Sequence, residues 1–321
     1  MKTEGPWSSI TAICPTYGRH TRLRDAIACF LLQDYCGYKQ LSILNDAPTP
    51  LRLLPNGDNE LIVDDSTKIV LVNAKKRFPN FGQKKQALAD SVETDLIAHW
   101  DDDDLALPWY LSTNIKVLKE HPEFECVKPP WAWYIRGVQN DVWIKCAVNR
   151  RFDGLMIFKR GTAVKYKNSM RQSAVPLLHD YVARGTIHCL RDTSPVIEDI
   201  SYGFRKGDDL RHLSRSGNNK TARRHFARRN EDFGNGEALL PADGLHDWAL
   251  EQMRVQFLQI ISGIKDVKFK SNTTGWIMFI REFRNKRITT KQVDDYFSKL
   301  ILESKAFDKA CKRLSAILRG D

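Results

Sequence analysis

Short apolar runs alternate with amphipathic segments over the first 120 residues. The apolar runs predict buried strands over residues 9–14, 41–44, 69–72 and 95–100. Between them, Leu23, Ile27 and Phe30 recur at helical spacing, which predicts a helix over residues 21–33, and a second helix is expected over 83–92. This alternation predicts an α/β fold in which helices flank a mostly parallel, Rossmann-type sheet on both faces.

The pattern is looser in the rest of the chain. Further strands are expected within residues 142–148, 153–159, 186–192 and 196–204, with a helix around 172–184. Residues 230–236 are polar and Gly-containing, which is typical of a linker, and the chain beyond them has helical spacing among many Lys and Arg residues. We therefore expect one domain over residues 1–230, with halves at 1–120 and 121–230, and a basic helical C-terminal region over 231–321.

Positive charge is concentrated in the second part of the chain. The net charge of the 321 residues is +11, yet residues 1–120 contain 14 Lys and Arg against 16 Asp and Glu. Residues 211–230 hold seven Lys or Arg and no acidic residue. A basic half of this kind predicts an anionic partner, which could be a nucleic acid, an anionic lipid or a charged glycan.

Several classes of protein do not fit the sequence. No window approaches the roughly 18–20 apolar residues of a membrane span, and the first residues lack the pattern of a signal peptide. The seven cysteines form no CxxC pair, so neither a zinc site nor a disulfide framework is indicated. These features predict a soluble cytoplasmic protein with buried thiols; they do not indicate its oligomeric state.

Acidic residues follow two of the predicted strands. Asp101 to Asp104 come directly after the strand at 95–100, and Asp46 follows the strand at 41–44. Ligands of open parallel sheets bind at the carboxyl ends of strands, and clustered carboxylates there suit Mg²⁺ or Mn²⁺. The alternatives are a solvated acidic loop before Pro108 and an Asx turn before Pro48.

Two common phosphate-binding motifs are missing. The sequence has no GxxxxGK[ST], and no GxGxxG follows the first predicted strand. Phosphates would therefore have to be held by a metal ion, which the acidic run could bind, and by basic side chains, which the basic half could supply.

Four motifs together resemble the family 2 glycosyltransferases of the GT-A fold. They are CPTYGR, SILNDA, GQKKQALA and AHWDDDDLALP, in that order, within a resemblance that covers residues 8–215. The resemblance implies an inverting transferase that moves a hexosyl or pentosyl group from a nucleotide-sugar, with UDP as the family's commonest nucleotide. Residues 1–120 would then bind the donor and 121–230 the acceptor.

The resemblance also implies roles for individual residues. Asp103 and His212 would bind the Mn²⁺ or Mg²⁺ ion, and Asp180 would be the general base, with Asp208 and Asp209 as alternatives. Lys85-Gln86 stands where the family often has a basic residue followed by Asn. The residues expected to bind the nucleotide-sugar are Pro15, Thr16, Tyr17, Arg19, Asp46, Lys84, Lys85, Asp101 and Asp102.

The acceptor is less constrained by the sequence. Trp131 and Trp133 could stack on a sugar or an extruded base, or belong to an aromatic core strand. A basic helical face is expected from Arg223, Arg224, Arg228 and Arg229. Three hypotheses follow: transfer to hydroxymethylated bases of DNA, as in some phage enzymes; transfer to a cell-surface or lipid-linked glycan; and a non-catalytic nucleic-acid-binding protein.

Overall fold

The computed structural model describes the first 120 residues almost completely and the later ones in pieces. The described residues are 9–129, 131–136, 141–146, 156–162, 166, 181, 187–188, 201–205, 236–245 and 247–253.

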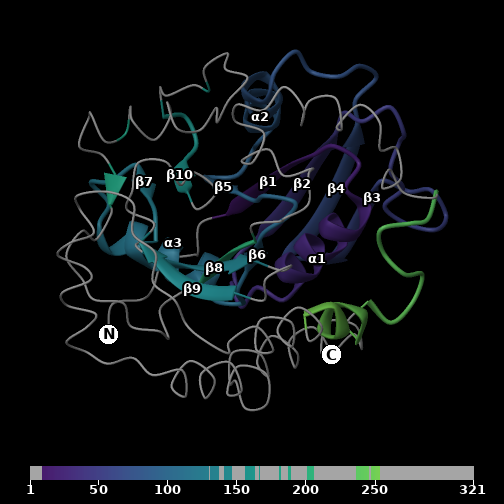
Figure 1. Cartoon of the computed structure of the whole chain (residues 1–321). Coiled ribbons are helices and arrows are strands. Elements are labelled where there is room, and N and C mark those ends of the chain that lie inside the picture. The colour runs from purple at the N-terminus through teal and green to yellow at the C-terminus, as the bar shows by residue number, and fades with distance from the viewer. Residues whose placement is uncertain are drawn as a thin grey trace.

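An eight-stranded sheet forms the centre of this part of the chain (Figure 1). Its strands are β1 (Ile10–Thr16), β2 (Lys39–Asn45), β3 (Glu60–Asp64), β4 (Thr67–Asn73), β5 (Leu96–His99), β7 (Cys126–Val127), β10 (Ile157–Lys159) and β11 (Ile187–His188). The order is β11-β7-β10-β5-β1-β2-β4-β3. The neighbours β5, β1, β2 and β4 are all parallel, whereas β3 and β10 run antiparallel to their neighbours.

A smaller sheet of four strands lies beside the first. Its order is β6-β12-β8-β9, made of β6 (Leu105–Ala106), β12 (Tyr202–Arg205), β8 (Trp131–Arg136) and β9 (Asp141–Cys146). Because β6 comes directly after the acidic run that follows β5, the run connects the two sheets.

Helices cover both faces of the large sheet (Figure 1). The helices are α1 (His20–Leu31), α2 (Phe81–Asp90) and α3 (Tyr110–Glu120). Side chains alternate between the faces along β1: Ala12 and Cys14 join the core of α1 and α3, and Ile13 joins the core of α2. The predicted class, a mostly parallel sheet between helices, is therefore confirmed.

The predicted elements of the first 120 residues occur with shifted ends. Strand β1 ends two residues later than expected and continues through Pro15 and Thr16. Ile13 accepts a backbone hydrogen bond from Trp100, so alternate residues of β1 face β5, and β5 ends opposite Ile13. The missing N–H of Pro15 therefore faces a position beyond the end of β5, and costs the sheet no hydrogen bond.

Predictions for the second half are tested only in part. Strands β9, β10, β11 and β12 overlap the four segments expected there. Of the helix at 172–184, only Tyr181 is described, as helical. Most of the C-terminal region lies outside the described residues, and the domain boundary at residue 230 stays a prediction.

Residues 236–245 and 247–253, the described part of that region, pack against α1. Ala238 pairs with Arg52 in an isolated parallel bridge, and the backbone N–H of Leu239 donates to the Arg52 carbonyl at 2.8 Å. Leu239 and Met253 are fully buried in the core beneath α1. In Figure 1 this green segment lies beside α1, far from α2.

Leu239→Ala is expected to lower the free energy of unfolding by about 2–5 kcal/mol, because it opens a cavity in the core beneath α1. Urea denaturation measures the change. Ile62→Ala is the control, because Ile62 is 67% exposed on edge strand β3 and its loss should change stability by about 0.5 kcal/mol or less. Equal effects of the two substitutions would contradict the packing of residues 236–245 and 247–253 into this core.

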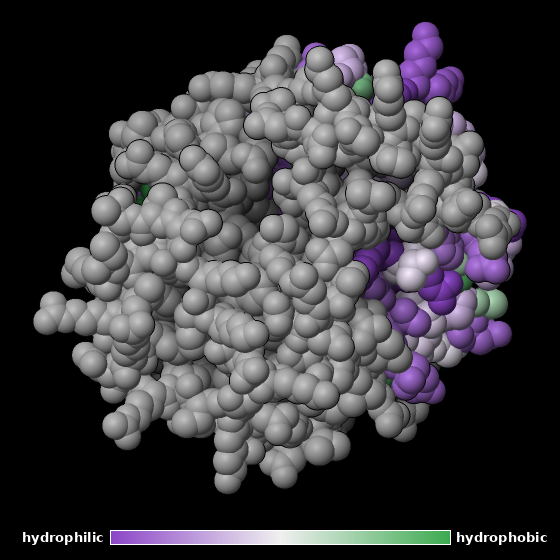
Figure 2. All heavy atoms as spheres, in the orientation of Figure 1, coloured by the Kyte–Doolittle hydropathy of each residue, from purple (hydrophilic) through white to green (hydrophobic). Residues whose placement is uncertain are grey.

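The described surface has little apolar area on the side of β3 and β4. Figure 2 shows mainly hydrophilic residues there, and the large hydrophobic side chains that are exposed are Ile62 and Val72. None of the helices in the described part of the chain combines the length and the apolar composition of a membrane span.

Candidate functional site

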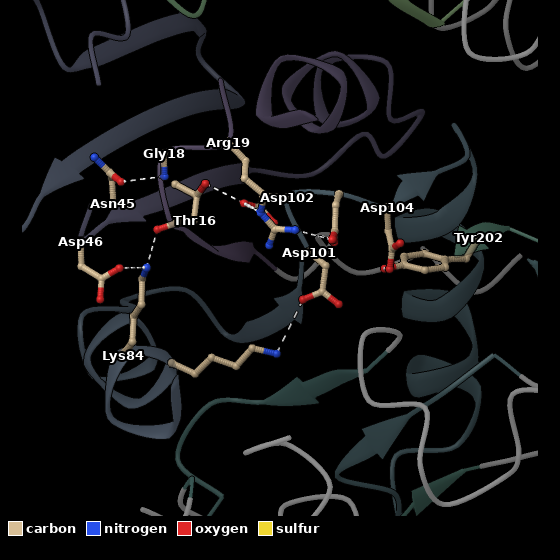
Figure 3. A network of polar contacts seen from close by, with 12 residues as sticks. Thr16, Gly18, Arg19, Asn45, Asp46, Lys84, Asp101, Asp102, Asp104 and Tyr202 are labelled. Carbon is tan, nitrogen blue, oxygen red and sulfur yellow. Dashed lines mark hydrogen bonds and ion pairs between the residues drawn. The ribbon is translucent and has the colours of Figure 1, made fainter. Parts of the chain in front are cut away.

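The site lies where the chain changes direction in the large sheet. From β1 the chain moves to β2 and β4 on one side, then returns to β5 on the other side of β1. The carboxyl ends of β1 and β5 are thus neighbours from which the connections diverge, and open α/β sheets bind ligands at such a point. Figure 3 shows the polar network that gathers there.

The turn after β1 is fixed by an asparagine that the sequence analysis had not singled out. Asn45, at the end of β2, accepts a hydrogen bond from the Gly18 N–H at 3.1 Å and donates to Asn73 of β4 at 2.9 Å. Gly18 has a φ of 69°, a left-handed conformation that glycine adopts without strain. Asn45 and Asn73 each end a strand, and the structure pairs them in register. An Asn at the end of two successive strands was the sequence signal that could have identified them.

Asp102 is the buried centre of the acidic run. Its Oδ2 accepts hydrogen bonds from Thr16 Oγ1 at 2.6 Å and Arg19 Nε at 3.1 Å, and its Oδ1 lies 2.6 Å from an Arg19 NH group. Burial raises the pKa of Asp102 to about 6, helped by the neighbouring carboxylates and opposed by Arg19 and Thr16. Burial alone would lower the pKa of Arg19, yet the carboxylates around it raise that pKa. Asp102 therefore positions Arg19 and is covered from solvent.

Asp101 and Asp103 are the members of the run that reach the surface. Their side chains are 25% and 16% exposed, against 1% for Asp102. Asp103 forms a very short ion pair with Arg19, and Asp101 Oδ1 lies 3.7 Å from Lys85 Nζ. Two carboxylates and two cationic groups thus face one another at the carboxyl end of β5.

Asp46 is held by a lysine at the start of α2. Lys84 Nζ makes short contacts with the Asp46 carboxylate and the Thr16 carbonyl, and the Phe78 N–H donates to the other carboxylate oxygen at 3.0 Å. Lys84 and Asp46 are both almost fully buried. Burial lowers the pKa of Lys84, and Asp46 partly offsets this effect. Lys84 therefore ties α2 to the ends of both β1 and β2.

Asp104 connects the run to the smaller sheet. Tyr202 of β12 donates its hydroxyl proton to Asp104 Oδ2 at 2.8 Å, and both side chains are buried. Burial, with the carboxylates nearby, raises the pKa of Tyr202. No sequence pattern connects these two residues, which lie 98 positions apart.

A basic side chain covers the ring of Tyr17. The guanidinium carbon of Arg77 lies 4.5 Å from the centre of that ring, which is a cation–π distance. Arg77 is exposed in the loop between β4 and α2. It was not among the predicted residues, although it belongs to the basic triplet Lys75-Lys76-Arg77.

The structure brings the predicted donor and metal residues of the first 120 positions together at one edge of the sheet. Pro15 is buried within β1. Trp131 and Trp133 lie on β8, whose pairing with β9 and β12 agrees with a strand there. The other predicted residues lie outside the described part: Asp180, Asp208, Asp209, His212, Arg223, Arg224, Arg228 and Arg229.

The donor set fits a hard divalent cation only in combination with a ligand. Among the described residues, no three His, Cys, Asp or Glu side chains are grouped so as to hold a metal ion by themselves. Asp101 and Asp103 would supply one or two carboxylates, and Mg²⁺ is commonly bound by such a pair together with substrate phosphates. The cationic groups of Arg19 and Lys85, which now face these carboxylates, mark where positive charge is stabilised.

Comparisons with known proteins give structural likeness at low identity. No family model and no curated protein matches the sequence. Residues 1–349 of S. aureus TarS in complex with UDP-GlcNAc share 11% identity with a TM-score of 0.45, covering 98% of this chain and 92% of that one. The mannosyltransferase PcManGT from Pyrobaculum calidifontis, in complex with GDP-Man and Mn²⁺, shares 12% identity with a TM-score of 0.42, covering 98% and 84%. These values are too low to transfer an activity.

Proposed function

We propose that this chain is a glycosyltransferase that moves a sugar from a nucleoside-diphosphate-sugar to an acceptor hydroxyl, with Mn²⁺ or Mg²⁺ as cofactor. One observation carries the proposal. Asp101 and Asp103 present their carboxylates at the switch point of the sheet, with Arg19 and Lys85 against them. This combination can bind a diphosphate and a cation at once, without a glycine-rich loop.

Different described residues would contact different parts of the donor. Tyr17 and Asp46 lie beside the end of β1, where the resemblance to family 2 enzymes expects the nucleotide base. Arg19 and Lys85 lie nearer the acidic run and would contact the diphosphate, which carries the negative charge. Asp101, 25% exposed, would accept hydrogen bonds from hydroxyls of the ribose or the sugar.

The proposed chemistry of transfer combines these residues with the base that the family resemblance implies. A bound divalent cation would supply charge neutralisation of the leaving diphosphate. Arg19 and Lys85 would add hydrogen bonds to the same developing charge. Asp180 is our proposed base, which takes the acceptor proton as the hydroxyl attacks the anomeric carbon from the face opposite the leaving group. A single displacement of this kind inverts the anomeric centre.

For the acceptor, we propose a polyanion, with hydroxymethylated bases of DNA as the first candidate. Support comes from the sequence: residues 121–321 contain 36 Lys and Arg against 23 Asp and Glu, and the stretch 211–230 holds seven Lys or Arg and no acidic residue. Such surfaces follow phosphate backbones. A cell-surface or lipid-linked glycan is the competing acceptor, since glycan synthesis is the commoner occupation of the family that the motifs resemble.

Release of nucleoside diphosphate tests the proposal. The full chain is incubated with Mn²⁺ and a panel of UDP- and GDP-sugars, with and without duplex DNA that carries hydroxymethylcytosine or hydroxymethyluracil. We expect release from at least one donor, stimulated by the modified DNA and not by unmodified DNA. Release that is indifferent to DNA would keep the transferase and reject the DNA acceptor. No release and no binding of any donor would reject the enzyme and favour the non-catalytic protein.

A further inference from the structure

Arg19 places its positive charge between the second and third aspartates of the acidic run, Asp102 and Asp103. Its guanidinium pairs with Asp102 through two nitrogens, Nε and an NH group, and reaches Asp103 through the other NH group (Figure 3 shows the pairing with Asp102). The guanidinium is therefore shared between a carboxylate that is 1% exposed and one that is 16% exposed.

The two pairings differ in how firmly they are held. Asp102 is buried, is also bonded by Thr16 and engages Arg19 through both oxygens, a geometry that is strong and directional. Asp103 contacts Arg19 through Oδ2 at the surface, where water and ions reach it. A competing cation would therefore displace Arg19 from Asp103 more readily than from Asp102.

A divalent cation and the third nitrogen of Arg19 cannot use the Asp103 carboxylate equally well at the same time. Two positive groups on one carboxylate repel each other, and that repulsion is large where side chains are partly desolvated. A diphosphate removes the conflict, because it provides oxygens both for the cation and for the released guanidinium nitrogen.

We infer that Arg19 neutralises Asp103 while no donor is bound and then turns its outer nitrogen to the diphosphate, remaining paired with Asp102. This exchange, in which Arg19 leaves Asp103 for the diphosphate, makes the binding of cation and nucleotide cooperative. The cation alone has to displace Arg19, whereas the cation with a nucleoside diphosphate gives Arg19 a new partner. This inference rests on the proposed function, because it assumes that the site takes both ligands.

Binding of Mn²⁺ in the absence of turnover tests the exchange. The affinity of the full chain for Mn²⁺ is measured by electron paramagnetic resonance with and without UDP and GDP, corrected for Mn²⁺ held by the nucleotide alone. Without nucleotide, Arg19→Gln should bind Mn²⁺ about tenfold more tightly than the wild type, and the tightening that nucleotide produces should fall by a similar factor. Unchanged or weaker Mn²⁺ binding by Arg19→Gln would overturn the inference.

A matched variant separates contact from overall charge. Arg77→Gln removes the same charge from the same edge of the sheet, but Arg77 lies over Tyr17. It should leave the Mn²⁺ affinity within about twofold of the wild-type value, because Arg77 is exposed and the field of an exposed charge is screened. If Arg77→Gln had the same effect as Arg19→Gln, the change in Mn²⁺ affinity would depend only on net charge, which would also overturn the inference.

A measurement on the wild type covers the case in which Arg19→Gln does not fold. Protein with ¹⁵N-labelled arginine is titrated with Mg²⁺ and UDP or GDP, and the Arg19 Nε–H signal is assigned by its loss in Arg19→Lys. The signal should stay protected from exchange, because the bond to Asp102 persists, and should shift more with both ligands than with Mg²⁺ alone. A signal that does not respond to the two ligands together contradicts the exchange.

The outcomes also separate this inference from the proposed function. A wild type that binds neither Mn²⁺ nor nucleotide would reject the function and the inference together. A wild type that binds both, with Arg19→Gln indistinguishable from it, would reject only the role of Arg19.

Discussion

Asp103→Asn is expected to lower the turnover number for sugar transfer by a factor on the order of a thousand, with little change in stability. Asp103 is one of the two carboxylates that reach the surface at the end of β5. An amide retains the shape but loses the negative charge that would hold a divalent cation. The diphosphate would then leave with its charge less well neutralised, so the chemical step should suffer more than donor binding.

The measurement is steady-state release of nucleoside diphosphate at several Mn²⁺ concentrations. A lost metal ligand predicts that high Mn²⁺ restores part of the activity, which a merely distorted site would not allow. Asp65→Asn is the control, because Asp65 is exposed in the turn between β3 and β4, away from the carboxyl ends of the parallel strands. Full activity of Asp103→Asn would remove Asp103 from the metal site.

Strands β1, β2, β4 and β5 of the central sheet could be predicted because each of them carries a local signal. The apolar runs at 9–14, 41–44 and 69–72 are separated by a periodic helix and a polar stretch, and each becomes a parallel strand. Strand β3 was missed because its apolar run, Leu61 to Val63, is only three residues long and lies on an exposed edge strand. Strands β6 and β7 have two residues each, too few for any periodicity.

The acidic residues of the candidate site were predictable, but its internal contacts were not. Strand ends followed by acidic residues identified Asp46 and the run at 101–104, because parallel strands bring their carboxyl ends to one edge. The order of exposure within the run was not predictable. Four consecutive aspartates look alike in sequence, whereas Thr16 and Arg19 select Asp102 for burial and Tyr202 selects Asp104.

The buried pair of Lys84 and Asp46 shows the same limit. Both residues were expected to contact the donor, yet in the structure each is the other's main ionic partner. A lysine in the first turns of a helix is ordinarily solvated, so its burial depends on the turn after β1 and on the loop before α2. These elements are brought together by the sheet order and not by any local pattern.

Lys84→Met is expected to lower the free energy of unfolding by about 3–5 kcal/mol, because it leaves the buried Asp46 carboxylate without its cation. Asp46→Asn alone should also destabilise the protein, because it leaves Lys84 buried without a counter-charge. The double substitution should cost less than the sum of the single ones, since it removes both charges. Urea denaturation of the four proteins gives the coupling free energy directly.

An exposed pair in the same sheet provides the control. Lys68 of β4 lies 2.9 Å from Glu60 of β3, with both side chains substantially exposed. Lys68→Met should change stability far less than Lys84→Met, since water already solvates Glu60. Additive effects of Lys84→Met and Asp46→Asn would contradict a coupled buried pair.

Coupling as large as expected would mean that the end of β1 is held by charge as well as by backbone pairing, because Lys84 also binds the Thr16 carbonyl. The affinity for the donor should then fall in Lys84→Met even without urea, when the protein is fully folded. The reason is that Thr16 positions Asp102 and, through Asp102, Arg19.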